Sequence, residues 1–193
     1  MNLGSIATRY SRALFEEARA KSVDKYIYDY LGALYENMSA VPEAQKALLN
    51  PRTKTEHKFK LLLTASGLKA NEKGKKPDAS LATGTDLYQR FLRLVLKHDR
   101  IYLMRFIIFV YQHLYRQHHN IDHVIFATAK EIDKPLEQKV IDKIHKITGR
   151  EVELETRVRP DLIGGFWVVV DDRLYDFSYR TRLQNIRKSL WNK

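Results

Sequence analysis

Cysteine is absent from this chain, and glycine and proline are scarce, with 8 and 5 residues among 193. Without cysteine the chain has no disulfide bonds or thiolate metal sites, and a reducing compartment is favoured. No apolar run at the N-terminus resembles a signal peptide. The most apolar segment, Ile101–Tyr111, is too short to span a bilayer and contains Arg105. We therefore expect a soluble protein, or one held at a membrane through a partner.

Basic residues outnumber acidic ones, and the excess is uneven along the chain. The 34 Lys and Arg residues against 23 Asp and Glu residues give a net charge of +11. Residues 1–120 contain 20 basic and 11 acidic residues, whereas residues 121–193 contain 14 and 12. The tail from Arg180 to Lys193 has five basic residues and no acid. Such a balance favours acidic partners, which include nucleic acid, an anionic membrane surface or an acidic protein.

The spacing of apolar residues predicts an α+β fold overall. A six-helix N-terminal bundle over residues 1–120 is followed by a small α/β C-terminal domain over residues 121–193. Apolar residues recur at helical spacing throughout the first region. The predicted helices cover residues 5–20, 23–38, 42–49, 57–65, 86–96 and 101–117.

Proline and capping residues set the predicted helix boundaries in the first region. Pro42 suits the first turn of a helix that ends before Asn50 and Pro51. Thr53 and Glu56 have the spacing of a capping box in front of the next helix. The polar segment 67–84, which contains a lysine-rich stretch at 69–80, reads as a loop.

After Asn120 the apolar period changes to that of a β-α-β-β-β-α unit. Strands are predicted over 122–132, 151–158, 163–170 and 173–177. Asp133 and Gly149 cap the helix between the first two strands. The closing segment 178–191 is predicted as a helix. The basic tail 180–193 fits a nucleic-acid-binding patch and, equally well, an amphipathic helix that rests on the sheet and exposes a basic face. Its apolar side contains Leu183, Ile186, Leu190 and Trp191.

No pattern of catalytic, cofactor-binding or metal-binding residues stands out. Gly164 and Gly165 precede a strand, whereas a phosphate loop follows a strand and opens a helix. They fit better as a bend at a strand start where a neighbouring segment approaches closely. His118 and His119 are adjacent on a helix and point in different directions, which does not suit tetrahedral zinc. The aromatic residues fall mostly on core stripes. We therefore predict no cofactor and no metal.

Four segments in order carry a resemblance to the delta subunit of F-type ATP synthase, the oligomycin-sensitivity-conferring protein family. Residues 6–18 resemble its opening helix, 50–62 its Asn-Pro segment with a basic helix, and 91–114 its paired helices. Residues 159–190 resemble its P-x-L-I-G-G-F signature with a strand, a turn, D-x-S and a basic closing helix. The matching signature residues include Pro160, Gly164, Gly165, Asp176 and Ser178.

The resemblance implies a non-catalytic peripheral-stalk (stator) subunit at the cytoplasmic face of the bacterial inner membrane. It would link the alpha/beta head to the b subunits, so that proton flow is coupled to ATP synthesis. It would associate with the membrane only through the complex, and bind neither nucleotide nor nucleic acid. The first and fifth helices would form a groove for N-terminal segments of alpha subunits. Candidate groove residues are Ala7, Tyr10, Ala13, Leu14, Leu92, Val95 and Leu96. The alternative function is a basic nucleic-acid-binding module.

Overall fold

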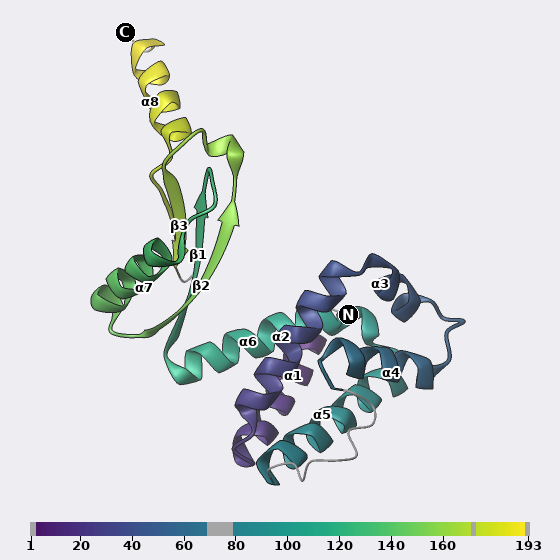
Figure 1. Cartoon of the computed structure of the whole chain (residues 1–193). Helices are drawn as coiled ribbons and strands as arrows, with labels where there is room; N and C mark the ends of the chain where they lie inside the picture. Colours follow the sequence, from purple (N-terminus) through teal and green to yellow (C-terminus); the bar gives the residue numbers. More distant parts are fainter. Residues whose placement is uncertain (1–2, 69–78, 171–172, 192–193) are drawn as a thin grey trace. The chain divides into compact units, whose positions relative to one another are not determined.

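The chain divides into two compact units, which are described separately. The computed structural model describes residues 3–68, 79–170 and 173–191. Unit 1 comprises residues 1–115 and unit 2 residues 116–193 (Figure 1). The sequence prediction put the boundary near Asn120, whereas the division of the structure falls between Tyr115 and Arg116, inside the last helix before the sheet.

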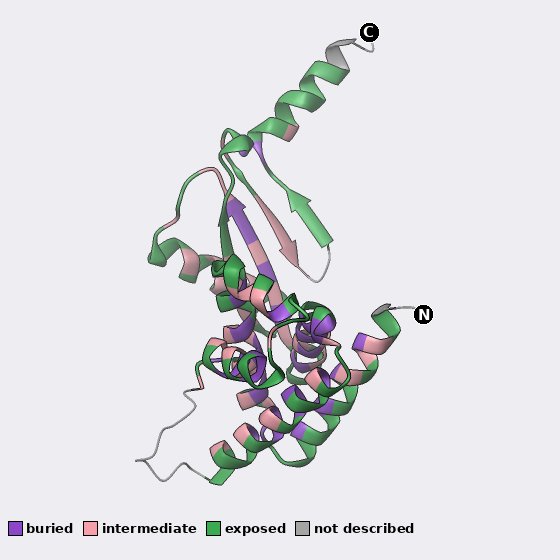
Figure 2. Cartoon of the chain, turned by 90° about the vertical axis from the view of Figure 1, so that its right-hand side faces the viewer, coloured by how far each residue is buried: buried purple, intermediate pink, exposed green. Residues whose placement is uncertain are grey.

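Helices account for the regular structure of unit 1. They are α1 (Leu3–Ala20), α2 (Asp24–Ala40), α3 (Pro42–Leu49), α4 (Thr55–Ala65), α5 (Ala79–Lys97), the 3₁₀ helix η1 (Ile101–Leu103) and α6 (Met104–His119). Each helix of this unit turns an apolar stripe inward, as the sequence period predicts (Figure 2). The largest fully buried side chains are Tyr88, Tyr111, Ile27, Leu31, Leu34, Leu48, Leu62, Leu92, Leu103, Met104, Ile107 and Ile108.

Several buried hydroxyl groups in this core are hydrogen-bonded, and two of these bonds join helices that are distant in sequence. The Ser11 hydroxyl of α1 lies 2.9 Å from the carbonyl oxygens of both Ala7 and Ile107, the latter on α6. The Tyr88 hydroxyl lies 2.6 Å from Ser66 Oγ. Burial raises the pKa of Tyr88, so its phenol stays neutral. These bonds satisfy groups whose burial is otherwise costly.

Two local predictions in unit 1 are wrong. Helix α4 begins at Thr55 with Lys54 as its N-cap, and no side chain caps it. The predicted capping box of Thr53 and Glu56 therefore does not form. Helix α5 begins at Ala79, so the last residues of the predicted loop 67–84 are helical. Residues 69–78 of that loop lie outside the described residues.

Unit 2 is a four-stranded sheet with two helices. Its elements are β1 (Ile121–Thr128), α7 (Lys134–Thr148), β2 (Glu151–Val158), the 3₁₀ helix η2 (Pro160–Leu162), β3 (Phe166–Val170), β4 (Arg173–Asp176) and α8 (Tyr179–Trp191). The strand order is β2-β1-β3-β4. Strands β1 and β2 run parallel with α7 as their crossover, whereas β3 pairs antiparallel with both β1 and β4. Strand β1 is central and contributes buried Val124, Phe126 and Ala127.

The two helices of unit 2 differ in how they are held. Helix α7 packs beside β2 and has the predicted caps. The Asp133 side chain accepts from the Leu136 N–H, and Gly149 is left-handed with φ 70°. Helix α8 does not rest on the sheet, contrary to prediction. It extends away from it (Figures 1 and 2), and Leu183 and Ile186 are each 55% exposed. The side chains of Leu190 and Trp191 lie outside the described ones.

Candidate protein-binding surfaces

A groove of about 520 Å³ runs between α1 and α5 on the surface of unit 1. Its lining residues are Arg9, Tyr10, Ala13, Leu14, Glu17, Leu87, Arg90, Phe91 and Leu94. The charges of Glu17 and Arg90 interact, and Arg100, which follows α5, donates to the Tyr10 hydroxyl. An earlier residue of α1 thus meets a later residue of the α5 segment, so the two helices run antiparallel. Three side chains of the floor, Leu14, Leu87 and Phe91, are nearly buried, while Leu94 remains 45% exposed.

The small residue Ala13 lies in the lining of this groove. Apolar residues on α5 at positions 87, 91 and 94 repeat at helical spacing and face α1. The result is an apolar channel with charged residues along its rims. This is the form of site that accepts the apolar face of a partner helix.

The predicted groove residues divide into two sets. Tyr10, Ala13 and Leu14 line the groove. Ala7, Leu92 and Val95 are fully buried in the core and present no surface. Leu96 is half-buried and lies outside the lining. Sequence analysis missed Leu87, Phe91 and Leu94, although their i, i+4, i+7 spacing was visible. It could not determine which of two apolar faces of α5 is committed to the core.

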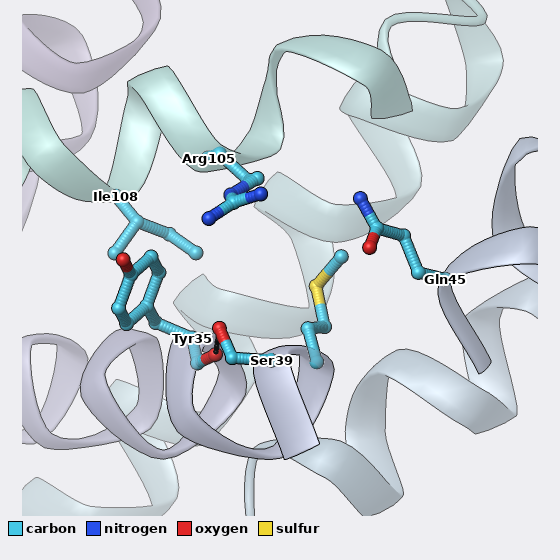
Figure 3. Close-up of a pocket in the computed structure, with 6 residues that line it drawn as sticks. Tyr35, Ser39, Gln45, Arg105 and Ile108 are labelled. Carbon is cyan, nitrogen blue, oxygen red and sulfur yellow. Dashed lines mark hydrogen bonds between the residues drawn. The ribbon is translucent and has the colours of Figure 1, made fainter. Parts of the chain in front are cut away.

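A second hollow, between α2, α3 and α6, is far smaller. Tyr35, Ser39, Gln45, Arg105 and the side chains of Met38 and Ile108 surround a space of about 10 Å³ (Figure 3). That volume holds one water molecule at most. The Arg105 guanidinium lies 5.7 Å from the centre of the Tyr35 ring, within the range of a cation–π contact. The hollow is too small for an organic ligand.

The glycine pair of unit 2 has the structural role that its sequence position predicts. A Cβ added to Gly165 would lie 2.4 Å from the Phe177 carbonyl oxygen, and one on Gly164 would lie 2.6 Å from the Tyr179 ring. Gly165 also has φ 74°. The Gly164 carbonyl accepts from the Tyr179 N–H at 3.0 Å. The prediction of a bend with a close approach is confirmed, and the approaching segment is the start of α8.

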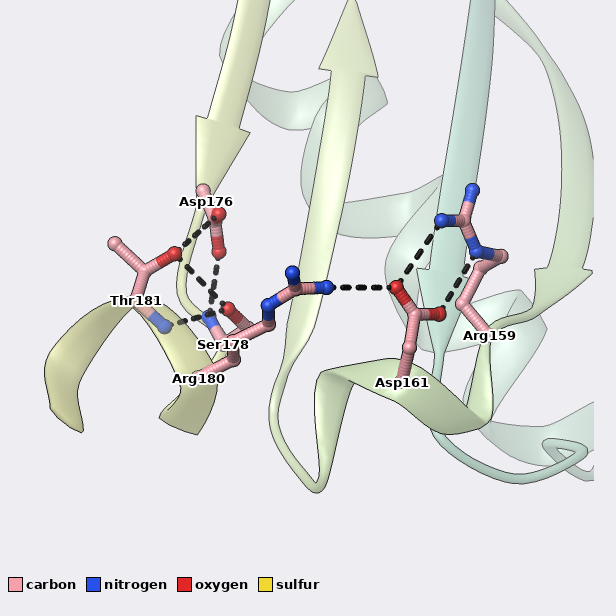
Figure 4. Close-up of polar contacts among 6 residues, drawn as sticks. All are labelled: Arg159, Asp161, Asp176, Ser178, Arg180 and Thr181. Atoms are coloured by element: carbon pink, nitrogen blue, oxygen red, sulfur yellow. Dashed lines mark hydrogen bonds and ion pairs between the residues drawn. The ribbon is translucent and has the colours of Figure 1, made fainter. Parts of the chain in front are cut away.

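Asp176 and Ser178 fix the start of α8 (Figure 4). Asp176 accepts from the Ser178 N–H at 2.8 Å and from the Thr181 hydroxyl at 2.7 Å. Buried Ser178 accepts from the Thr181 N–H at 3.3 Å, which is an N-cap arrangement. These hydrogen bonds lower the pKa of Asp176, and the bond from the Ser178 backbone N–H has the largest effect.

An ion-pair cluster ties α8 to the turn that begins at Pro160. Asp161, in η2, pairs with Arg159 at 2.9 Å and with Arg180 of α8 at 3.0 Å (Figure 4). Polar contacts at Asp161, Gly164, Asp176 and Ser178 thus hold only the first turn of the helix. Beyond this turn, α8 extends away from the sheet as an arm (Figure 1).

Unit 2 exposes large apolar side chains on β4, on α8 and, at Phe177, on the connection between them. Between 45% and 63% of each side chain is accessible. The residues are Leu174, Tyr175, Phe177, Tyr179, Leu183 and Ile186. Leu174 and Tyr175 are successive strand residues and point to opposite faces of the sheet, so the six side chains do not form a single patch. Exposed large apolar side chains on adjoining elements are nevertheless candidates for an interaction site. We call these six residues the α8–β4 surface.

Comparison with known proteins identifies the family. The family described as ATP synthase delta (OSCP) subunit matches residues 6–190. The chain belongs to this family. It is a structural, non-catalytic subunit of the peripheral stalk of an ATP synthase. The glycine pair and the groove described above are therefore features of a stator subunit, and the alternative of a nucleic-acid-binding module finds no support.

Relatives of this delta-family chain extend over its full length. ATP synthase subunit delta of Parabacteroides distasonis is 37% identical over 98% of both chains. The subunit of the same name from Phocaeicola vulgatus is 30% identical over 97% of this chain and 95% of the relative. A chain of the Toxoplasma gondii mitochondrial ATP synthase hexamer shares the fold, with a TM-score of 0.70 at 18% identity, and the match covers 96% and 97% of the two chains.

The histidines of this stator subunit form no metal centre in the described part of the chain. No three histidine, aspartate or glutamate residues converge there. His123 Nε2 lies 3.4 Å from Glu155. Burial and the neighbouring Arg116 charge nevertheless lower the pKa of His123, so it is neutral at neutral pH. Among the same residues, no helix is long and apolar enough to cross a membrane.

Proposed function

We propose that unit 1 binds the head of the ATP synthase by accepting an N-terminal helical segment of an alpha subunit in the α1–α5 groove. The observation that carries this proposal is the open apolar channel, lined by Tyr10, Ala13, Leu87, Phe91 and Leu94. A partner helix could bury its apolar face there and leave its polar face in solvent. Each large side chain so buried contributes roughly 1.5–3 kcal/mol.

Unit 2 is proposed to bind the b subunits of the peripheral stalk through the α8–β4 surface. The arm of α8 supports this role, because Leu183 and Ile186 lie exposed on a helix that contacts little of its own sheet. Exposed Arg182, Arg187 and Lys188 give the arm a basic face. A subunit held at both units would stop the head from turning with the rotor, and ion flow would then drive ATP synthesis.

The proposed place of action is the cytoplasmic face of the bacterial inner membrane, reached only through the assembled complex. The bacterial source of the two relatives described above supports this assignment. Nucleotide and nucleic acid are not expected as direct ligands.

Leu94→Asp tests the alpha-subunit contact. The side chain is already 45% exposed in the free protein, so folding should be unaffected. Placing a carboxylate under a bound helix should weaken binding of a synthetic alpha N-terminal peptide by at least about tenfold. Titration calorimetry measures the affinity, and Phe106→Asp, which is 57% exposed on α6, serves as the control. Equal affinities for both variants would exclude the groove.

The stalk contact is tested by Leu183→Asp combined with Ile186→Asp. Co-purification with the b subunits should be lost, while the thermal melt stays unchanged, because both side chains are exposed. Ile147→Asp on α7, where the side chain is 76% exposed, is the control and should retain the b subunits. Retention by the double variant would contradict the assignment.

A further inference from the structure

Ile163 in unit 2 has a backbone conformation that its side chain disfavours. It lies between η2 and Gly164, and its φ of 66° with ψ −38° falls outside even the left-handed helical region. Among the described residues, three other non-glycine residues have positive φ, and all are small and polar: Ser22, Asp99 and Asn120. A β-branched residue at positive φ is a genuine outlier. The backbone at Ile163 is therefore strained.

The fold of unit 2 does not account for this strain. Leu162, the preceding residue, is buried, whereas Ile163 is 69% exposed. The Ile163 N–H donates to the Pro160 carbonyl at 3.2 Å, and any residue except proline could make that bond. A glycine at this position would make the turn without strain, as Gly165 does with φ 74°. Within this chain, an exposed isoleucine gains no burial free energy that would offset the strain.

The loop that contains Ile163 lies at the base of α8. The Tyr179 ring of α8 packs over Gly164, because a Cβ added to that glycine would lie 2.6 Å from a ring carbon. Tyr179 is 53% exposed, and Leu183 follows it by one turn on the same side of the helix. The exposed apolar row of α8 thus begins beside the strained residue.

Positive charge surrounds the base of α8. Asp161 pairs with Arg159 at 2.9 Å and with Arg180 at 3.0 Å, so two cations share one carboxylate (Figure 4). Arg182 and Lys188 add charge farther along α8, whose sequence contains no acidic residue. Complementary charge on a partner favours encounter and binding here. The matching partner is therefore a helix whose apolar face is flanked by acidic residues.

We infer that Ile163 is an anchor residue for the peripheral stalk: its side chain packs against the apolar face of an acidic-flanked b-subunit helix that lies across the loop and the first turns of α8. This inference rests on the proposed function of the α8–β4 surface. The fixed turn presents the side chain to solvent before the partner arrives, so binding requires less ordering of the loop. Burial of Ile163 in the complex offsets the strain that the free protein retains.

Three replacements at position 163 separate the side chain from the backbone. Ile163→Val keeps an apolar β-branched side chain, and the full chain should bind purified b subunits within about threefold of the wild type. Ile163→Ala and Ile163→Gly remove that side chain and should each weaken binding by about tenfold or more in titration calorimetry. No variant should melt below the wild type, because the side chain is exposed. Ile163→Gly should melt at the same temperature or higher, because glycine relieves the strain.

Controls distinguish direct contact from an effect on the fold. Ile147→Ala on α7, where the side chain is 76% exposed in regular helix, should leave the affinity unchanged. Lost affinity of Ile163→Ala with a lower melt, or with displaced amide signals from the first turn of α8, would overturn the inference. Unchanged affinity of Ile163→Ala would also overturn it, while the proposed function stands if Leu183→Asp with Ile186→Asp abolishes binding. If that double variant binds normally too, both proposals fail.

Discussion

Replacing Gly165 by alanine should destabilise unit 2 for two separable reasons. The first is the backbone, because φ of 74° is costly for any residue with a Cβ. The second is the contact, because the added Cβ would lie 2.4 Å from the Phe177 carbonyl oxygen and 3.1 Å from Ser178 Cα. Both neighbours are backbone atoms at the junction of β4 and α8, so neither can rotate away.

Gly149→Ala is a control that isolates the backbone contribution. Gly149 has φ 70°, yet an added Cβ would meet no atom within 4 Å. Its cost should be about 1–2 kcal/mol, the penalty of a left-handed conformation. Gly165→Ala should cost about 1–3 kcal/mol more, the usual range for overpacking. Both substitutions reduce the freedom of the unfolded chain equally, so that effect cancels in the comparison.

Tryptophan fluorescence during urea unfolding can measure this difference. The 2 tryptophans of the chain, Trp167 and Trp191, both belong to unit 2, so the signal reports that unit. The difference in free energy of unfolding between the two variants follows from the midpoints and slopes. Equal destabilisation by both variants would refute the reasoning, because the close approach at Gly165 would then contribute no free energy.

Two further predictions concern pH and one concerns the core. Asp176→Asn should lower the stability of unit 2 by about 1 kcal/mol at neutral pH. The folded-state pKa of Asp176 is lowered, so the extra stability of the wild type is present above about pH 4 and is lost as pH falls through that lowered pKa. Urea unfolding at several pH values measures this loss. The folded-state pKa of His123 is lowered too, so stability should fall as pH drops below about 6.5, and His123→Gln should reduce that slope. Tyr88→Phe should cost about 1 kcal/mol by thermal melt, since Ser66 keeps its bond to the Leu62 carbonyl.

Local signals predicted most of the secondary structure. Asp133 and Gly149 define α7 because a side-chain acceptor and a left-handed glycine act within a few residues. Pro42 similarly fixes the start of α3. The glycine pair was interpretable because its position before a strand excludes the geometry of a phosphate loop. In each case the local backbone structure is determined by residues that are close together in the sequence.

The sequence does not determine which apolar face of a helix packs in the core and which one faces another chain. Helix α5 has apolar residues on more than one side, so its sequence does not distinguish the buried Leu92 and Val95 from residues that line the groove, and only packing shows which side is buried. The apolar stripe of α8 resembles that of a helix packed on a sheet, and the sequence therefore allows that arrangement. An interface with another chain produces the same stripe, so one sequence cannot distinguish the two arrangements.

The bond between Ser11 and Ile107 has a consequence for biosynthesis. Its two residues are separated by 96 positions, so α1 leaves the ribosome well before its partner α6 exists. At about 5–20 residues per second, the delay is roughly 5–20 s. Throughout that interval, the face of Phe15 that Tyr111 of α6 later contacts is open to solvent or to chaperones. The bundle can therefore close only after its last helix has been synthesised.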